Sequence, residues 1–374
     1  MPLPSFLERW GIEVSANPFG FPRLAEYLAR VHGGRVTNLR VSPLGGGRQG
    51  DKGYGYGVPL RLDYDLEASP QRAVLESVRP GAFGHEHRAD RAQLLLWAHD
   101  AFNRLPRHVA SLDVGAVCAN GVLEPLGKAE EFFMLAQFVD GREYADDLLR
   151  LKAGGALSQS DLERADALCD YLIDIHRVRG PDPGLYVRRV RELLGHGECL
   201  FGVADSYPPG YAATLERIER VCVSWRWRLK EHARRSPRLC QVHGDFHPWN
   251  ILFRDGTDFS VLDRSRGEWG EAADDVTCLT LNYVFFSLQR SGRLEGDFET
   301  LWRRFWDRYL EGTGDRAILE VAAPFLAWRA LVMASPVWYP ALEERLRRHL
   351  LALVLNVLAD ERFDPARVNE YCGA

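Results

Sequence analysis

Lysine is rare in this sequence. Of the 47 basic residues only Lys52, Lys128, Lys152 and Lys230 are lysines, and the rest are arginines. The formal net charge is −5, and residues of both signs are interspersed along the chain. A chain without a block of basic charge has little to attract nucleic acid or an anionic membrane surface. We therefore expect neither as a partner.

Paired cysteines and long apolar runs are also absent. The seven cysteines are odd in number and widely scattered, and no two form a C-x-x-C pair, which argues against a disulfide framework or a zinc site and fits a reducing compartment. No stretch approaches the ~18 apolar residues of a membrane span, and the N-terminus lacks a basic region followed by a long apolar core. These absences predict a cytoplasmic protein.

The length of 374 residues predicts two packed lobes, since single cores rarely grow beyond about 250 to 300 residues. We expect an N-terminal lobe at 1–137 and a C-terminal lobe at 138–374, where apolar residues recur mainly at helical spacing. Turn signals and apolar patterns in the N-terminal lobe predict five strands and one helix. The strands are expected at 35–44, 54–66, 72–78, 109–122 and 132–139, and the helix at 86–105.

A short predicted β-hairpin interrupts the helical C-terminal part. Its strands are expected at 251–253 and 259–262, and the Asp-Gly between them is a strong hairpin signal. The preceding His243-Gly-Asp-Phe-His-Pro-Trp-Asn250 fits the kinase catalytic-loop pattern H-x-D-x-x-x-x-N. Antiparallel pairing would return Asp263, at the end of the second strand, to the neighbourhood of Asn250 and Asp245.

These three residues suit phosphoryl transfer to a hydroxyl. That chemistry uses one aspartate to accept the hydroxyl proton, and an asparagine and a second aspartate to hold Mg²⁺. Asp245 is therefore the candidate base, and Asn250 and Asp263 are the candidate ligands for Mg²⁺, which prefers oxygen donors. A zinc site at His243 and His247 would need a third ligand that the spacing does not offer. A simple turn followed by a solvated strand end is the other alternative, but several specific residues coincide at the required spacing.

The strings HGDFHPWNILF and VLDRSRGEWGEAADD, with Tyr-Leu-Ile-Asp-Ile-His176 upstream, resemble the aminoglycoside phosphotransferase and choline kinase family. The resemblance implies an α+β, protein-kinase-like bilobal fold and transfer of the γ-phosphoryl group of ATP, or another nucleoside triphosphate, to a small-molecule hydroxyl. It implies the same roles for Asp245, Asn250 and Asp263, and makes Asp275 the residue that anchors the catalytic loop. His243 and His247 are expected to support the loop, and Asp274 to be a surface charge.

A glycine-rich segment is the candidate phosphate loop. Gly45, Gly47 and Gly50 satisfy G-x-G-x-x-G between two predicted strands, where missing Cβ atoms let backbone amides approach phosphate oxygens. A flexible turn would explain the glycines equally well. A Walker-A loop lacks its Gly-Lys pair here, and a dinucleotide-binding loop would lead into a helix. The resemblance places adenine near Val74, Gln137 and Val139, at the hinge between the lobes.

The expected third strand departs from the kinase pattern. Kinases place a phosphate-binding lysine there, paired with a glutamate of the next helix, but Glu76 occupies the expected position and would repel Glu86. Lys52 could supply the missing charge from the second strand. Arg79, Arg88 or Arg91 could supply this positive charge instead. In that case Glu76 would pair with Arg88 or Arg91. Otherwise the protein is an inactive pseudokinase that acts as a binding or regulatory module.

The segment after Asp263 is the candidate acceptor region. Acidic residues there would suit an aminated acceptor such as an aminoglycoside or a choline-like alcohol, whereas arginines argue against one. The sequence therefore leaves open an antibiotic, amino alcohol, sugar or related metabolite as the small-molecule acceptor. The mixed set comprises Arg264, Arg266, Glu268, Trp269 and Glu271.

Overall fold

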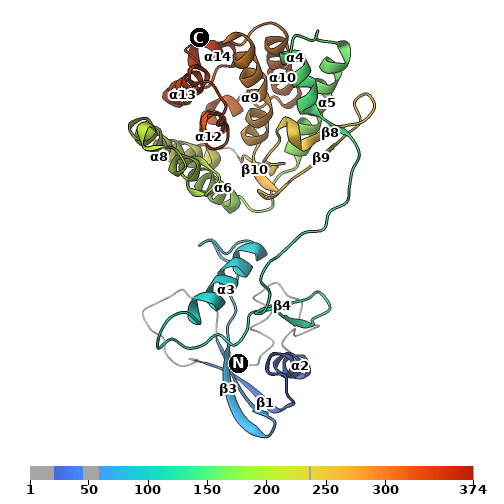
Figure 1. Ribbon diagram of the computed structural model, residues 1–374, viewed down its shortest axis with the longest axis vertical. Coiled ribbons are helices and arrows are strands. Elements are labelled where there is room, and N and C mark those ends of the chain that lie inside the picture. The colour runs from blue at the N-terminus through green and yellow to red at the C-terminus, as the bar shows by residue number, and fades with distance from the viewer. Residues whose placement is uncertain (1–20, 45–58, 236, 374) are drawn as a thin grey trace. The chain divides into compact units, whose positions relative to one another are not determined.

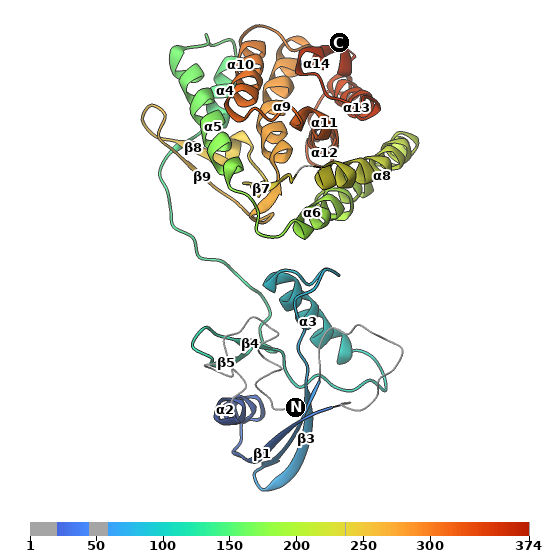
Figure 2. The ribbon, with the colours of Figure 1, turned by 180° about the vertical axis from the view of Figure 1, so that it is seen from behind.

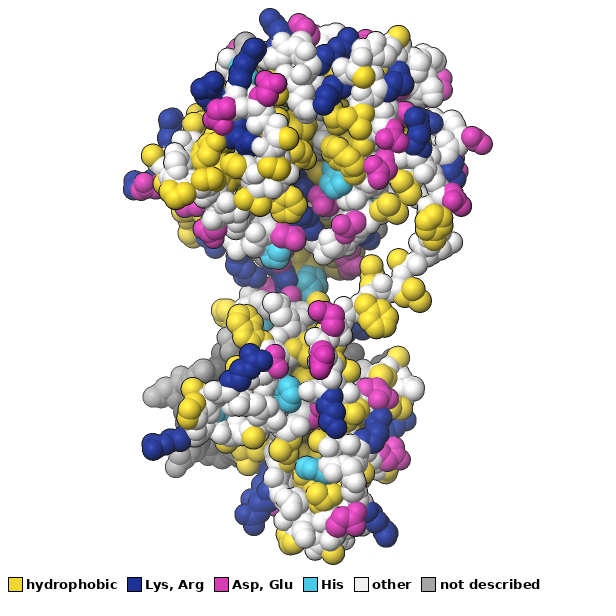
Figure 3. All heavy atoms as spheres, viewed as in Figure 1, with side chains coloured by type: hydrophobic (Ala, Val, Ile, Leu, Met, Phe, Trp, Pro, Cys, Tyr) yellow, Lys and Arg dark blue, Asp and Glu magenta, His cyan; other side chains and the backbone are white. Residues whose placement is uncertain are grey.

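The computed structural model describes residues 21–44, 59–235 and 237–373. The chain forms two compact units, 1–136 and 137–374 (Figure 1). Each unit has an apolar core of its own. On the face shown in Figure 3, positive and negative side chains are interspersed. No helix in the described residues is long and apolar enough to cross a membrane.

The N-terminal unit is built on a three-stranded antiparallel sheet with the order β1-β2-β3. Leu62 and Tyr64 on one face of β2 are buried with Leu24 and Leu28 of α2. The alternating residues of the strand thus pack against residues one helical turn apart. A separate pair is formed by β4 and β5. The elements are α2 (Phe21–His32), β1 (Val36–Pro43), β2 (Leu60–Leu66), β3 (Ser69–Leu75), α3 (Arg88–Phe102), β4 (Gly115–Val117) and β5 (Leu123–Pro125).

The structure differs from the expected N-terminal lobe in four ways. The strand expected at 132–139 is wrong, because these residues form no ladder with another strand, and β-propensity makes a strand only where a neighbour supplies partners. The strand expected at 109–122 is reduced to β4, with β5 after it. The helix α2 was not predicted. In addition, β3 ends at Leu75, so Glu76 lies beyond the strand.

The C-terminal unit packs helices around α9 (Figure 2). This helix is buried on every side from Ala272 to Leu288, as expected for a helix surrounded by others. The helices α4, α5, α10 and α12 contact it, and α6 and α8 lie side by side. The helices are α4 (Tyr144–Lys152), α5 (Gln159–Arg177), α6 (Gly184–Gly195), α7 (Leu200–Asp205), α8 (Ala212–Arg235), α9 (Ala272–Ser291), α10 (Gly296–Thr313), α11 (Ile318–Val321), α12 (Ala323–Ala334), α13 (Glu344–Ala359) and α14 (Val368–Tyr371), with 3₁₀ turns η2 (Pro209–Tyr211), η3 (Pro248–Asn250) and η4 (Pro365–Arg367).

Two small sheets hold the ends of the loops 242–250 and 262–268. One has the order β6-β8-β9 and the other pairs β10 with β7. The β8-β9 hairpin confirms the sequence prediction, with Ile251 opposite Val261 and Phe253 opposite Phe259. The strands are β6 (Arg142–Glu143), β7 (Leu239–Gln241), β8 (Ile251–Phe253), β9 (Phe259–Val261) and β10 (Trp269–Glu271). Loop 242–250 therefore runs from β7 to β8, and loop 262–268 runs from β9 to β10.

Candidate active site

The backbone of loop 242–250 is fixed by the start of α9. Asp275 is fully buried, and its two carboxylate oxygens accept the amide N–H groups of His243 at 2.8 Å and Gly244 at 2.7 Å. His176 Nε2 lies 3.2 Å from the same carboxylate, and His176 Nδ1 lies 2.8 Å from the Tyr309 hydroxyl. Burial alone would raise the pKa of Asp275, but the hydrogen bond and charge of His176, followed by the loop amide, hold it below 3.8.

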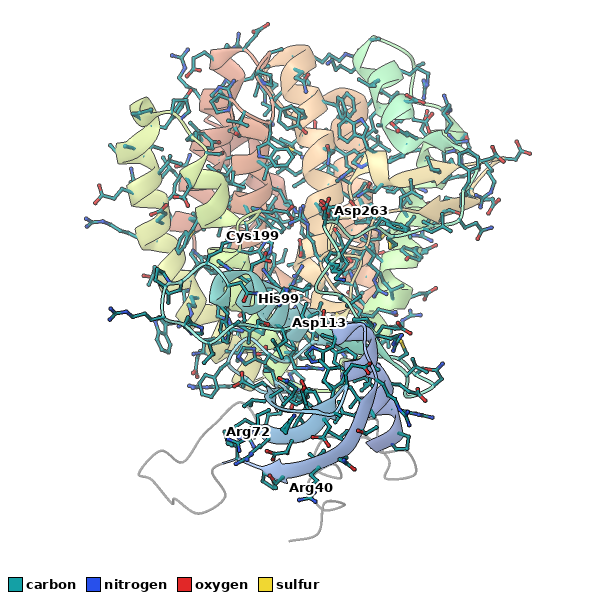
Figure 4. The ribbon with its side chains drawn as sticks, turned by 60° about the horizontal axis from the view of Figure 1, so that its bottom comes forward. Arg40, Arg72, His99, Asp113, Cys199 and Asp263 are labelled. Atoms are coloured by element: carbon teal, nitrogen blue, oxygen red, sulfur yellow. The ribbon has the colours of Figure 1, made fainter. Side chains whose placement is uncertain are left out.

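Asp245, Asn250 and Asp263 come together through the hairpin. The amide group of Asn250 donates to the carbonyl of Asp245 at 3.0 Å, and the backbone N–H of Leu262 donates to the carbonyl of Asn250 at 2.8 Å. Asp263 follows directly and has a φ of 53°, a left-handed conformation that few residues other than glycine adopt. Figure 4 labels Asp263 on the segment after β9. The structure thus brings the three predicted residues to one end of the β8-β9 hairpin.

The Asp245 carboxylate is held by a buried arginine. Arg329 Nη1 of α12 donates to Asp245 Oδ1 at 2.5 Å, and Arg329 Nη2 donates to the carbonyl of Gly244 at 2.8 Å. On the other side, Arg266 Nη2 lies 3.5 Å from Asp245 Oδ2. Burial alone would raise the pKa of Asp245, but Arg329 and then Arg266 outweigh it and lower the pKa below 3.8. The carboxylate is therefore ionised at neutral pH.

The prediction that Asp274 is a surface charge is wrong. Asp274 is 1% exposed, and its carboxylate accepts Arg329 Nη2 at 2.8 Å and Arg189 Nη2 at 3.1 Å. Arg189 in turn donates to the carbonyl of Arg266 at 2.9 Å. Asp274 is therefore the buried countercharge of two arginines that approach from α6 and α12.

Arg329 is a site residue that the sequence reasoning missed. It lies 84 residues after Asp245, so spacing gives no sign of their contact. A signal was present, however, because α12 reads Ala-Pro-Phe-Leu-Ala-Trp-Arg-Ala-Leu-Val-Met-Ala and carries one charge in an otherwise apolar helix. A buried charge of this kind needs a charged or polar partner.

The two histidines of the loop lie close to the candidate base. His243 is buried, and its Nδ1 accepts the backbone N–H of Asp245 at 3.3 Å. His247 Nε2 lies 3.9 Å from Asp245 Oδ2. Burial is the main cause that lowers the pKa of His247 below 6.5, so its imidazole is neutral at pH 7.

The residues expected to bind nucleotide fall into three groups. Gly45, Gly47, Gly50 and Lys52 lie outside the described residues. Val74 lies on β3 of the N-terminal unit, whereas Gln137 and Val139 belong to a segment of the C-terminal unit that precedes β6 and has no regular secondary structure. Arg91, one of the arginines considered as a partner for Glu76, donates to the carbonyls of His85 and Glu86.

Most of the candidate acceptor residues are engaged in holding the fold. The Glu271 carboxylate is buried and accepts two bonds from Arg238, both 2.6 Å long. Arg264 donates to the carbonyls of Val242 and Glu268, and the Glu268 carboxylate accepts the Trp269 indole N–H. Of the five residues considered, Arg266 is the one placed beside Asp245.

The phosphotransferase enzyme family model matches residues 61–312 of this chain. The match spans more than half of the sequence, and the chain belongs to this family. The protein is accordingly a small-molecule kinase, a phosphotransferase with an alcohol group as acceptor. Together with the mixed helices and small antiparallel sheets, the match confirms the expected α+β, protein-kinase-like class. It gives no support to the inactive alternative.

Solved structures of small-molecule kinases are similar to the chain at low identity. Amicoumacin kinase hAmiN in complex with AMP-PNP, Ca²⁺ and Ami is 15% identical, with 88% of this chain and 91% of that chain covered and a TM-score of 0.40. A putative fructosamine-3-kinase from Thermobifida fusca YX-ER1 is 16% identical, with 91% and 99% covered and a TM-score of 0.36. Choline kinase from Cryptosporidium parvum Iowa II is 10% identical, with 90% and 86% covered and a TM-score of 0.33. No curated protein matches the chain.

Proposed function

We propose that the protein transfers the γ-phosphoryl group of ATP, or of another nucleoside triphosphate, to a hydroxyl of a small molecule in a reaction that requires Mg²⁺. The observation that carries this proposal is the convergence of Asp245, Asn250 and Asp263 at one end of the β8-β9 hairpin. A general base and two oxygen ligands for the metal are among the groups that kinase chemistry requires of the protein.

Asp245 is the base in this proposal. Its Oδ1 is tied to Arg329, and its Oδ2 is the oxygen available to accept the proton of an acceptor hydroxyl. A carboxylate acts as a base only when it is ionised, and the lowered pKa of Asp245 keeps it so at neutral pH. The acceptor would therefore bind beside Asp245 Oδ2, close to the guanidinium of Arg266.

Asn250 and Asp263 would hold the magnesium ion. Asn250 uses its amide N–H to bond the carbonyl of Asp245, so its amide oxygen is left to ligate a cation. Asp263 adds a carboxylate from a backbone conformation that is uncommon for aspartate and concentrates at functional sites. Hard oxygen donors of this kind suit Mg²⁺, which takes its remaining ligands from water and phosphate. A bound Mg²⁺ would supply charge neutralisation for the β- and γ-phosphates.

The N-terminal lobe, 1–137, would bind the nucleotide, and the C-terminal lobe, 138–374, would bind the acceptor. The proposed nucleotide contacts are the glycines at positions 45, 47 and 50, the charge of Lys52, and Val74, Gln137 and Val139 around adenine. The inactive alternative depends on Glu76 in the third strand. Because β3 ends at Leu75, Glu76 lies beyond the strand, and this weakens the reason for that alternative.

Calorimetric titration with AMP-PNP tests the metal-dependent part of the proposal. Binding should require Mg²⁺ and should be lost in Asp263→Ala. Asp258→Ala is the matched control, because Asp258 is an exposed carboxylate of the same hairpin that pairs with Arg254. A protein that binds no nucleotide in the presence of Mg²⁺ would contradict the proposal.

A screen for ADP release tests the phosphoryl transfer. The acceptors should include aminoglycosides, amino alcohols, sugars and hydroxylated metabolites, since the geometry favours a hydroxyl without selecting the rest of the molecule. We expect at least one alcohol to raise ADP release above the rate with water, and Asp245→Asn to abolish the increase. Nucleotide binding without any alcohol-dependent release would favour a binding module instead.

A further inference from the structure

Arg329 is buried where an apolar side chain would ordinarily lie. It is 7% exposed, in a helix whose other residues are all apolar. Burying a charge is costly unless the charge is paired, and a well-packed apolar residue often gives equal or greater stability. The ion pairs of Arg329 therefore call for an explanation other than stability, and one of its partners is the candidate base Asp245.

The guanidinium of Arg329 bridges two aspartates and a backbone carbonyl. Nη1 donates to Asp245 Oδ1 at 2.5 Å, and Nη2 donates to the carbonyl of Gly244 and to Asp274 Oδ1, both at 2.8 Å. The planar fork of an arginine fixes the directions of these bonds. A carboxylate bound through one oxygen to such a fork has little freedom to rotate.

Neighbouring side chains hold the fork itself in place. Asp274 is also bonded by Arg189, which joins α6 to the same network. The guanidinium of Arg329 lies 3.8 Å from the centre of the Trp328 ring, and the Trp328 indole N–H donates to the carbonyl of Glu198 at 2.9 Å. Charge and stacking thus both favour this arrangement of Arg329.

We infer that Arg329 is a positioning residue for Asp245: it holds Oδ1 so that Oδ2 is presented to the acceptor hydroxyl, with Asp274 as the countercharge that keeps the arginine in place. This inference rests on the proposed function of Asp245 as base. In this assignment Arg329 positions the side chain of the base, and Asp275 positions the backbone of the loop. Arg329 itself does not touch the reacting atoms in this assignment.

The test compares Arg329→Gln and Arg329→Lys with the unaltered protein. Arg329→Gln should lower kcat roughly 100-fold, the scale of loss for a misplaced catalytic group, and should leave the affinity for Mg²⁺-AMP-PNP within about twofold, since the displaced group is not a nucleotide ligand. Arg329→Lys keeps the charge but loses the fork, so it should restore kcat in part. The measured rate is that of ADP release, with the best alcohol from the screen as acceptor and with water as the comparison.

Arg150→Gln is the matched control. Arg150 donates to the Asp161 carboxylate at 2.6 and 2.7 Å and to the carbonyl of Ala156 at 2.8 Å, so it also joins a carboxylate and a carbonyl, between α4 and α5. This variant should keep the full kcat per folded molecule. If Arg329→Gln also keeps kcat once the folded fraction is measured by thermal unfolding, the inference is wrong. Where Arg329→Gln does not fold, the kcat of Arg329→Lys is compared with that of the control in the same way.

A crystal structure of Arg329→Gln, or of Arg329→Lys where the first does not fold, separates this inference from the proposed function. The backbone of residues 243–245 should stay in place, because Asp275 holds it, while the Asp245 carboxylate should move from its position. If the unaltered protein releases no ADP but the carboxylate moves, the proposed function fails and the positioning role stands. A carboxylate that stays in place overturns the positioning role whatever the activity.

Discussion

Asp274 and Asp275 are adjacent at the start of α9, and they hold the same loop in two different ways. Asp275 accepts the backbone amides of His243 and Gly244, whereas Asp274 reaches the Asp245 side chain through Arg329. One carboxylate therefore fixes the course of the loop, and the other secures the arginine that holds the base. This division predicts different effects for substitutions at the two positions.

Asp275→Asn should destabilise the protein. An amide offers one acceptor oxygen where the carboxylate offers two, so the N–H groups of His243 and Gly244 compete and one buried donor is left unpaired. Hydrogen bonds to charged groups contribute about 1.5 to 3 kcal/mol each, and we expect a loss of that size in the free energy of unfolding at pH 7. Urea unfolding measures it, with the exposed Asp258→Asn as a control that changes stability little.

The advantage of the unaltered protein over Asp275→Asn should depend on pH. Folding lowers the pKa of Asp275 below 3.8, so the ionised carboxylate stabilises the fold at every pH above that value. The contribution is lost as the pH falls below 3.8 and the folded protein takes up the proton. Urea unfolding from pH 7 down to pH 3 should show an advantage that shrinks only at the acidic end. A difference that already shrinks near pH 6 would contradict the assignment.

Asp245→Asn should slow the chemical step strongly while leaving nucleotide binding intact. The amide has nearly the same shape but cannot accept the hydroxyl proton, and loss of a general base costs about 10²- to 10⁴-fold in rate. We expect kcat to fall within that range and the affinity for Mg²⁺-AMP-PNP to change little, because Asp245 is not among the proposed ligands of metal or nucleotide. A kcat close to that of the unaltered protein would show that another group is the base.

The sequence predicted the parts of the site that are local in the chain. The β8-β9 hairpin was predicted from its Asp-Gly turn and the strands around it, and the structure places Asn250 and Asp263 at its end as expected. These residues flank a short hairpin, so spacing and strand pairing determine their proximity. No long-range packing had to be known.

Contacts between distant segments could not be predicted in the same way. Asp274 looked like a surface charge because its partners Arg189 and Arg329 lie 85 and 55 residues away. The strand expected at 132–139 failed for a related reason, since propensity indicates which residues suit a strand but not whether a neighbouring strand is present. In both cases the missing information was the tertiary partner.

Gly244 is a position in the catalytic loop where we expect a methyl group to be poorly tolerated. Its φ is 86°, and a Cβ added there would lie 3.2 Å from Cβ of Arg266. The left-handed conformation costs a residue with a side chain roughly 1 to 2 kcal/mol, and the close approach adds to that cost. Gly256 in the β8-β9 turn is the matched control, because its φ is 60° and an added Cβ would meet no atom within 4 Å.

Gly244→Ala and Gly256→Ala should therefore differ in activity as well as in stability. Both variants incur the cost of the left-handed backbone, which thermal unfolding measures, but Gly244→Ala also pushes the loop away from Arg266 and shifts the adjacent Asp245. We expect a clear drop in kcat per folded molecule for Gly244→Ala and none for Gly256→Ala. Equal kcat values in the two variants would mean that the loop tolerates the displacement, and that the position of Asp245 is set by its side-chain contact with Arg329 alone.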